Sequence, residues 1–198
     1  MICPKCNYKA DDGAFCVNCG TKLVPEAPAQ NQGVKLYFDT NGISMINYKF
    51  LIKDEFGNVK YTAATVTESL VRMKSRLYDL YGNTILDVFQ QSKMTLSAIN
   101  FDIIQNGQVI SELLQKNKFT SFTYLLPAYG ISIEGDFFSW NFCFYDCNHN
   151  LIGTVSKKVL SFGDHYEIAL ADSSLEILAI AAVMGIQLVT ANQRRRRR

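Results

Sequence analysis

The sequence predicts a mainly β protein, with a small zinc-binding module in front of it and one apolar helix at its end. Four cysteines with metal-ligand spacing lie within the first 20 residues, and short runs of β-branched and aromatic residues follow from residue 34. An apolar stretch of 17 residues then precedes five consecutive arginines. With 198 residues, 48% of them hydrophobic and 12% aromatic, the chain can form one sizeable core and a small appendage, but not two full domains.

The prediction of a zinc site depends on the four N-terminal cysteines. Cys3, Cys6, Cys16 and Cys19 form two C-x2-C pairs separated by nine residues. One pair can place two thiolates on one side of a tetrahedral Zn²⁺ ion, and the second pair closes the other side. Two disulfides are the alternative, but they need an oxidising compartment, and the start Met-Ile-Cys-Pro has no secretory signal. The spacing therefore predicts one structural Zn²⁺ bound by these four residues.

The segment around these cysteines, CPKCNYKADDGAFCVNCGTKL at 3–23, resembles the small zinc ribbons that begin many bacterial and archaeal proteins. We assign the ribbon to residues 1–24. Its three lysines face two aspartates, and four thiolates on Zn²⁺ leave two further negative charges, so it offers no basic track for phosphates. Nucleic acid is therefore a disfavoured partner, and we expect a structural or protein-docking module.

A linker and a β-rich domain follow the ribbon. Residues 25–33, PEAPAQNQG, contain two prolines and no bulky apolar side chain, which is typical of a semi-extended linker. The larger domain is assigned to residues 34–192. Its candidate strands are 35–38, 48–53, 59–66, 70–77, 84–90, 94–99, 101–105, 109–115, 119–125, 131–134, 141–145, 151–157 and 166–170. Closely spaced strands of this kind indicate an antiparallel meander, sandwich or barrel.

A faint repeat marks the turns between these strands. The segments DEFGN at 54–58 and DLYGN at 79–83 share one pattern, and QNGQ at 105–108 continues the 25-residue spacing of their glycines. DCNHN at 146–150 looks like a fourth turn of this kind without the glycine. Glycine readily adopts the positive φ that such turns require. The repeat therefore predicts regular hairpins and up-and-down strand order.

The end of the domain is predicted to be one buried helix at 174–190. Ser173 followed by Glu176 reads as a capping box. The stretch LEILAIAAVMGIQLVTA at 175–191 is apolar on every face, so it must be buried all round or lie in lipid. At 1.5 Å per residue it spans about 25 Å, which is short for a bilayer core. A membrane anchor is therefore the disfavoured alternative, because the segment carries Glu176 and the β domain would lose its core.

Taken together, residues 34–192 resemble the LURP-one-related family. The resemblance is carried by the D-x-x-G-N hairpins, the segment IEGDF at 133–137, a later strand followed by Asp146, and the final apolar helix. That family shares the Tubby C-terminal-like fold with phospholipid scramblases. The resemblance implies a closed barrel of about twelve strands around one C-terminal helix. It also implies binding, since Tubby domains engage phosphoinositides and scramblases meet membranes.

Nothing in the sequence indicates catalysis. The two histidines, His149 and His165, belong to no catalytic motif, and the sequence contains no phosphate-binding loop, zinc-protease or serine-hydrolase motif. Cys143, Cys147 and His149 can be drawn as a second metal site. We expect instead that Cys143 points inward and acts as a small core residue. The protein is therefore predicted not to be an enzyme.

The charge distribution separates the remaining functions. The formal charge of the chain is +2. The tail at 193–198 contains five arginines and so supplies five of the positive charges, which leaves the rest of the chain acidic. These arginines are Arg194, Arg195, Arg196, Arg197 and Arg198. We expect a cytoplasmic binding or scaffold protein that docks a protein partner through its ribbon. The alternatives are a peripheral membrane protein whose arginines contact anionic lipid weakly, and a transcription-associated regulator.

Overall fold

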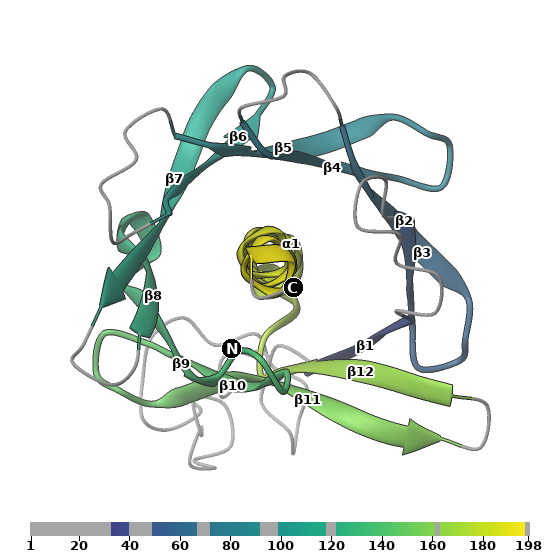
Figure 1. Ribbon diagram of the computed structural model, residues 1–198. Helices are drawn as coiled ribbons and strands as arrows, with labels where there is room; N and C mark the ends of the chain where they lie inside the picture. Colours follow the sequence, from purple (N-terminus) through teal and green to yellow (C-terminus); the bar gives the residue numbers. More distant parts are fainter. Residues whose placement is uncertain are drawn as a thin grey trace, which may run out of the picture. The chain divides into compact units, whose positions relative to one another are not determined.

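The computed structural model describes residues 33–39, 49–66, 72–91, 99–117, 122–160 and 163–196. The predicted ribbon at 1–24, the linker up to residue 32 and most of the candidate strand at 94–99 lie outside these residues. Within them, twelve antiparallel strands form a closed barrel around one long helix, α1 (Figure 1). The predicted fold class, a mainly β barrel around a C-terminal apolar helix, is confirmed.

The strands follow one another around the barrel in sequence order. They are β1 (Val34–Asp39), β2 (Lys49–Lys53), β3 (Val59–Thr65), β4 (Lys74–Tyr78), β5 (Thr84–Gln90), β6 (Phe101–Gln105), β7 (Gln108–Asn117), β8 (Phe122–Leu126), β9 (Ile131–Asp136), β10 (Asn141–Tyr145), β11 (Leu151–Leu160) and β12 (Gly163–Leu170). β12 pairs with β1, from Val34 opposite Leu170 to Asp39 opposite His165. This last pairing closes the sheet and removes the free edges that an open sheet would expose.

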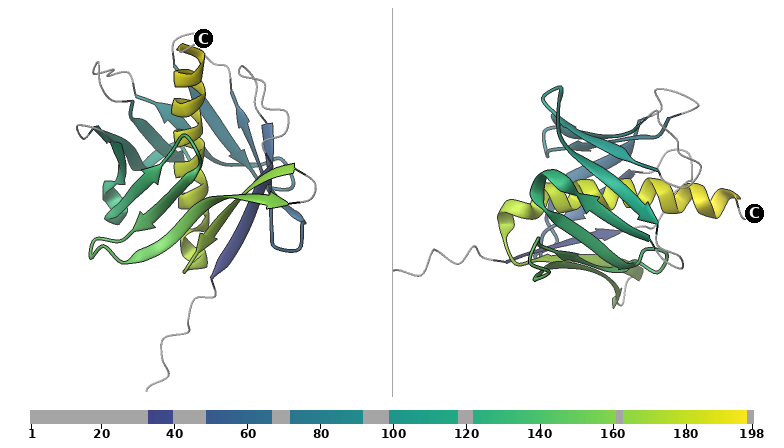
Figure 2. Two further views of the ribbon diagram at one scale, coloured as in Figure 1. Left: turned by 60° about the horizontal axis from the view of Figure 1, so that its bottom comes forward. Right: turned by 90° about the vertical axis from the view of Figure 1, so that its left-hand side faces the viewer.

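Up-and-down order gives the barrel two different ends. The connections β2–β3, β4–β5, β6–β7, β8–β9 and β10–β11 all lie at one end, which we call the hairpin end. β1 starts there, and β12 leads there into α1. The helix then runs along the inside of the barrel and ends at the opposite end (Figure 2).

Three strands, β5, β6 and β10, have the bounds that the sequence predicts, and the burial of residues in β5 and β10 shows why their pattern indicates a strand. In β5, Leu86, Val88 and Gln90 are buried and their neighbours are half-exposed, and in β10 Phe142 and Phe144 are buried. This is the period-two alternation of a strand with one face on the core. The predicted strand at 101–105 matches β6 in the same way.

The largest difference in the described strands is at β4, which begins at Lys74 rather than at residue 70. Just before it, the Met73 backbone N–H donates to the Gln90 side-chain Oε1 at 3.0 Å. The Arg72 guanidinium donates twice to the Gln90 carbonyl oxygen, at 3.0 and 2.8 Å. Side chains therefore take over backbone groups that a regular ladder would use, and the strand starts later.

The helix α1 (Glu176–Arg196) is apolar on every face because it meets the barrel wall on every face. Ile180 and Ala182 lie on different faces, yet they are 1% and 0% exposed. The window Ser173–Thr190 has a mean hydropathy of 1.7, which by length and composition would allow a membrane span, but 78% of it is buried inside the barrel. The structure therefore favours the central helix over the membrane anchor.

Side-chain size adapts the barrel to the helix. At Gly185 a Cβ atom would lie 2.5 Å from Leu113 Cδ2, so the helix backbone approaches β7 more closely than any side chain would allow. Across the barrel, large rings fill the wider space: Phe38 lies 5.7 Å from both Phe50 and Trp140, and 5.3 Å from Tyr166, between ring centroids. The core is thus closed by a glycine on one side and by aromatic packing on the other.

The start of the helix corrects the predicted capping box. Asp172, not Ser173, is the capping residue: its Oδ1 accepts from the Ser174 backbone N–H at 2.8 Å, and a 3-10 turn at Ser173–Leu175 precedes α1. Glu176 instead accepts from Lys60 Nζ on β3 at 2.6 Å and is 7% exposed. The buried carboxylate is satisfied by this ion pair, which fastens the start of α1 to the barrel wall. The helix also runs to Arg196, beyond its predicted end at residue 190.

Candidate functional site

The inside of the barrel is filled by side chains. Residues from all twelve strands' inner faces and from α1 form one hydrophobic core, and a void near the hairpin end between Leu126, Phe144 and Leu178 has a volume of only about 10 Å³. A cavity of that size holds at most one water molecule. Binding by the described part of this domain therefore has to use its outer surface.

The first notable surface feature is the β2–β3 turn at the hairpin end. Asp54 Oδ1 accepts from the backbone N–H groups of Phe56 and Asn58 at 2.9 and 2.8 Å, and Oδ2 accepts from Asn58 Nδ2 at 3.1 Å. Gly57 has φ of 84°, a conformation that glycine adopts without strain. The turn is therefore held by three hydrogen bonds to one carboxylate, and Phe56 at its tip is 81% exposed.

Two further hairpins repeat this arrangement. Asp79 accepts from the Tyr81 and Asn83 backbone and from Asn83 Nδ2, each at 2.8 Å. Asp146 accepts from the Asn148 and Asn150 backbone at 2.9 and 2.8 Å and from Asn150 Nδ2 at 2.9 Å. The fourth turn predicted from the sequence is thus confirmed, with His149 at φ of 62° in the place of glycine.

These hydrogen bonds also hold the three carboxylates in their charged form. Side-chain hydrogen bonds from Asn83 and Asn150 are the main reason why the pKa values of Asp79 and Asp146 lie below the ordinary value. At Asp54, desolvation is the largest influence and opposes ionisation, but the bonds from Asn58 and Phe56 together outweigh it and lower the pKa. All three turns therefore carry a negative charge at neutral pH.

The hairpin end collects large hydrophobic side chains that face solvent. Tyr81 is 89% exposed and Phe56 81%. They occupy the same position in two neighbouring turns, each of which is held by hydrogen bonds to its aspartate. Four others share their end of the barrel, and we call the six together the hairpin-end surface. Its members are Phe56, Leu80, Tyr81, Val109, Tyr129 and Leu151. Exposed apolar groups gathered at one end of a domain are typical of an interaction site.

A shallow groove of about 350 Å³ adjoins this surface beside Leu151. Its floor includes Ala169 on β12, where the small side chain lies between Lys35 on β1 and Thr154 on β11. Glu55 from the β2–β3 turn also lines it. The groove is thus lined by one lysine, one glutamate and small apolar residues. Through Leu151 it continues the hairpin-end surface onto the outer wall of the barrel.

The comparison with known proteins decides the family. A family model described as LURP-one-related matches residues 34–187, which run from the start of β1 into α1. The chain belongs to the LURP-one-related family. The resemblance inferred from the turns and the final helix is confirmed by this match.

Two similar proteins extend the comparison. The uncharacterized protein YxjI of Bacillus subtilis (strain 168) is 30% identical over 115 residues, which are 57% of this chain and 69% of that protein. The X-ray structure of the Arabidopsis thaliana protein AT5G01750 has a TM-score of 0.53 and 12% identity, and covers 82% of this chain and 93% of that chain. At that identity the likeness shows the fold, a barrel in keeping with the LURP-one-related match.

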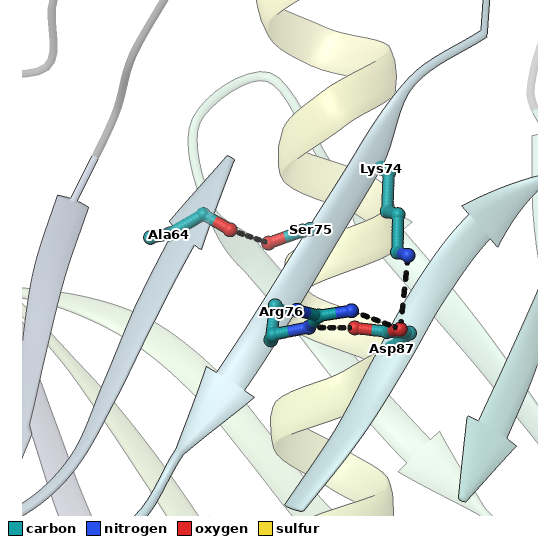
Figure 3. A network of polar contacts seen from close by, with 5 residues as sticks. All are labelled: Ala64, Lys74, Ser75, Arg76 and Asp87. Atoms are coloured by element: carbon teal, nitrogen blue, oxygen red, sulfur yellow. Dashed lines mark hydrogen bonds and ion pairs between the residues drawn. The ribbon is translucent and has the colours of Figure 1, made fainter. Parts of the chain in front are cut away.

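A polar network on the outer wall of the LURP-one-related barrel is a second candidate site (Figure 3). Asp87 on β5 accepts from Arg76 Nε and Nη2 at 2.6 and 2.9 Å and pairs with Lys74 Nζ at 3.1 Å, both on β4. Behind them, Ser75 points inward and donates to the Ala64 carbonyl at 3.1 Å. Asp87 is thus engaged by two cations, so the network is better suited to joining β4 to β5 than to holding a ligand.

The same network predicts how stability depends on pH. Desolvation is the largest influence on Asp87 and opposes its ionisation, but the hydrogen bonds and charges of Arg76 and Lys74 together lower its pKa. A folded-state pKa below the unfolded value of about 4 adds stability above pH 4 that is lost as the pH falls through the folded pKa. We expect Asp87→Asn to lower the free energy of unfolding by about 2–3 kcal/mol at pH 7.

Denaturant unfolding at pH 7 and at pH 3 tests this expectation. The difference between the parent protein and Asp87→Asn should be smaller at pH 3 than at pH 7, because below the unfolded-state pKa the unfolded chain binds a proton at Asp87 and the stability gained from the ionised carboxylate falls. Glu112→Gln, on the exposed side of β7, is the matched control and should change stability little at either pH. A penalty for Asp87→Asn that is equally large at pH 3 would contradict an electrostatic role.

The cysteines and histidines singled out in the sequence differ in whether the structure describes them and in where they lie. Cys3, Cys6, Cys16 and Cys19 lie outside the described residues. The expectation that Cys143 points inward is wrong: Phe142 and Phe144 face the core, so Cys143 between them lies on the outer face of β10 and is half-exposed.

Near it, Cys147 is exposed in the β10–β11 turn, and the His149 ring stacks on Tyr145 with centroids 4.3 Å apart. The side chain of His165 is not among those described. Among the described residues, no three His, Cys, Asp or Glu side chains are grouped closely enough to hold a metal ion. The hairpin-end surface was not predicted as a site, although the bulky aromatic residues within its turn motifs were visible in the sequence.

Proposed function

We propose that this LURP-one-related protein is a non-enzymatic binding or scaffold protein. In this proposal the N-terminal ribbon holds one structural Zn²⁺ through Cys3, Cys6, Cys16 and Cys19, and the barrel presents its hairpin-end surface to a protein partner. The observation that supports the proposal best is that two turns, each fixed by hydrogen bonds to its aspartate, expose Phe56 and Tyr81 to solvent. A barrel with a filled interior gives these turns a rigid base.

Preorganisation is the physical reason for preferring a binding role. Exposed aromatic rings contribute most to association when little conformational entropy is lost on binding. The turn backbones are already fixed by Asp54 and Asp79, so only the ring torsions of Phe56 and Tyr81 remain to be ordered. Tyrosine and phenylalanine are also enriched in the buried centres of protein interfaces.

The hairpin-end role is tested by a double variant, Phe56→Ser with Tyr81→Ser. Both side chains are exposed, so the thermal midpoint should change little, while binding of the protein partner should weaken at least tenfold. Proteins retained by the two immobilised forms are compared quantitatively, with Leu51→Ser on the outer wall of β2 as the control. Identical retention by all three forms would contradict a partner site at the hairpin end.

The zinc part makes a separate prediction. The chain divides after Asn31, ahead of the barrel, and all four predicted ligands come before that division in the sequence. Elemental analysis should give one zinc per chain, and Cys16→Ser should lose it. Chelation should remove the metal and leave the β circular dichroism of the barrel largely intact. A purified protein without zinc but with an ordered N-terminal unit would contradict the assignment.

Peripheral binding to anionic lipid is a second candidate, favoured by the length of α1. The helix extends to Arg196, so Arg194, Arg195 and Arg196 lie at the barrel end opposite the hairpins. A basic residue near an anionic surface contributes about 1 kcal/mol, and the attraction is screened over about 8 Å at physiological salt. We expect weak, salt-sensitive co-sedimentation with phosphatidylserine vesicles that disappears when residues 194–198 are deleted. Equal sedimentation with neutral vesicles would contradict it.

A further inference from the structure

The hairpin end combines exposed aromatic rings with carboxylates. In the β2–β3 turn Asp54 and Glu55 precede Phe56, and in the β4–β5 turn Asp79 precedes Tyr81. A guanidinium group binds best where it can stack on an aromatic face and pair with a carboxylate at its edge. Arginine also stacks on a ring elsewhere in this chain, since Arg72 Cζ lies 4.0 Å from the centre of the Phe89 ring.

The net charge of the hairpin end points the same way. Besides the Lys60–Glu176 ion pair, the described residues at this end carry five carboxylates and two lysines. The carboxylates are Asp54, Glu55, Asp79, Asp146 and Asp172, and the lysines are Lys35 and Lys53. This acidic, aromatic end would repel an anionic membrane and attract an arginine-rich segment.

The chain itself carries such a segment, Arg194–Arg198, and the described part of it, Arg194–Arg196, lies at the other end of the barrel. α1 starts at the hairpin end and has 21 residues, so Arg196 lies about 30 Å away along the helix axis. The backbone of Arg194, Arg195 and Arg196 is helical, which keeps these residues on that far side. A contact between the hairpin end and these arginines must therefore join two copies of the chain.

We propose that the hairpin end of one copy binds Arg194–Arg198 of a second copy, head to tail. The turns at Phe56 and Tyr81 are two strand spacings apart around the barrel, about 10 Å. An α-helix with its side chains is about 10–12 Å across, so the helical arginines at the end of α1 can contact both turns at once. One arginine segment can thus reach both turns. The interface is heterologous, so each pair leaves one hairpin end and one arginine segment open, and larger assemblies form as concentration rises.

This inference rests on the proposed binding role of the hairpin end and names one occupant for it. Sedimentation velocity on the full-length purified protein tests it with two variants. The head variant carries Phe56→Ser and Tyr81→Ser, and the tail variant carries glutamine in place of all five arginines. The unmodified protein should associate at low salt, with affinity falling about tenfold by about 0.15 M salt.

Mixing the variants gives the decisive result. Each alone should be monomeric, because one lacks the aromatic rings and the other the guanidinium groups. An equimolar mixture should form one-to-one dimers and nothing larger, since only the tail variant's hairpin end and the head variant's arginines remain. Lysine in place of the five arginines should weaken association without abolishing it, because lysine keeps the charge and lacks the planar fork. Leu51→Ser should associate like the unmodified protein.

Three outcomes would overturn the head-to-tail contact. They are an unmodified protein that stays monomeric at low salt, a variant mixture that stays monomeric, and a head variant that associates as strongly as the parent. Monomeric protein whose arginines bind phosphatidylserine vesicles would assign the segment to membranes instead. If copies do not associate but the head variant still loses its separate protein partner, this inference fails while the proposed function stands.

Discussion

Replacing Ile180 with aspartate should leave the barrel unfolded at room temperature. Ile180 is 1% exposed in the second turn of α1, where the barrel wall surrounds it. A carboxylate there would have neither water nor a partner, a cost of several kcal/mol against a typical domain stability of about 5–15 kcal/mol. Circular dichroism and one-dimensional NMR of the expressed protein should show the loss of the β fold. Ala182→Asp, on another face of the helix, should behave in the same way.

Two companion variants keep this prediction informative. Ile180→Ala removes volume without adding charge and should remain folded, with the free energy of unfolding lowered by about 2–4 kcal/mol. Leu80→Asp places the same charge on a side chain that is 64% exposed and should change stability by less than about 0.5 kcal/mol. A soluble Ile180→Asp protein with parental stability would refute the central helix and revive the membrane anchor.

Gly185→Val should have the second largest effect. A Cβ atom at this position would lie 2.5 Å from Leu113 Cδ2 and 3.5 Å from Val88 Cγ1, and both residues are fully buried. The added side chain must push α1 away from β7 or displace Leu113. Overpacking usually costs 1–3 kcal/mol, and we expect about 3 kcal/mol here because valine is also branched at Cβ.

A double-mutant cycle measures whether the clash is with Leu113. Leu113→Ala alone should destabilise by about 2–5 kcal/mol, because it leaves a cavity. Combined with Gly185→Val, which fills part of that space, the total loss should be at least about 1 kcal/mol smaller than the sum of the two single losses. If the two losses are additive, the valine side chain does not clash with Leu113, and α1 lies farther from β7 than the structure indicates.

Most of the strands could be predicted because their signals are local. β5, β6 and β10 alternate buried and more exposed residues, and the hairpin turns at 54–58 and 79–83 share the order D-x-x-G-N. Closure of the barrel could not be derived from these signals, since it depends on pairing between β1 and β12, more than 120 residues apart. It came from the family resemblance.

The start of α1 shows how a distant partner overrides a local pattern. Ser173 and Glu176 fit a capping box, and Asp172 fits a cap equally well one residue earlier. Glu176 is unavailable for the box because Lys60, on β3, binds it at 2.6 Å. Lys60 lies 116 residues before Glu176, so the sequence around position 176 does not predict this ion pair.

The sequence also held two signals that point to surface positions. Cys143 lies between Phe142 and Phe144, and in a strand with both phenylalanines on the core the residue between them must face outward. Phe56 and Tyr81 sit at the tip of D-x-x-G-N turns, where a side chain cannot return to the core. The Asp87 network had no such signal, because it depends on the register of β4 against β5.

Hydrogen–deuterium exchange of α1 in the native full-length protein tests the central claim, a rigid barrel closed on a buried helix, most directly. Backbone amides of residues 179–190 are surrounded by the barrel wall, so they should exchange only when the whole domain unfolds. Their exchange should therefore match that of the slowest amides in β5, β6 and β10, and a denaturant that lowers global stability should accelerate all of them together. Helix amides that exchange while those strands stay protected would contradict the account, because α1 would then leave the barrel without unfolding it.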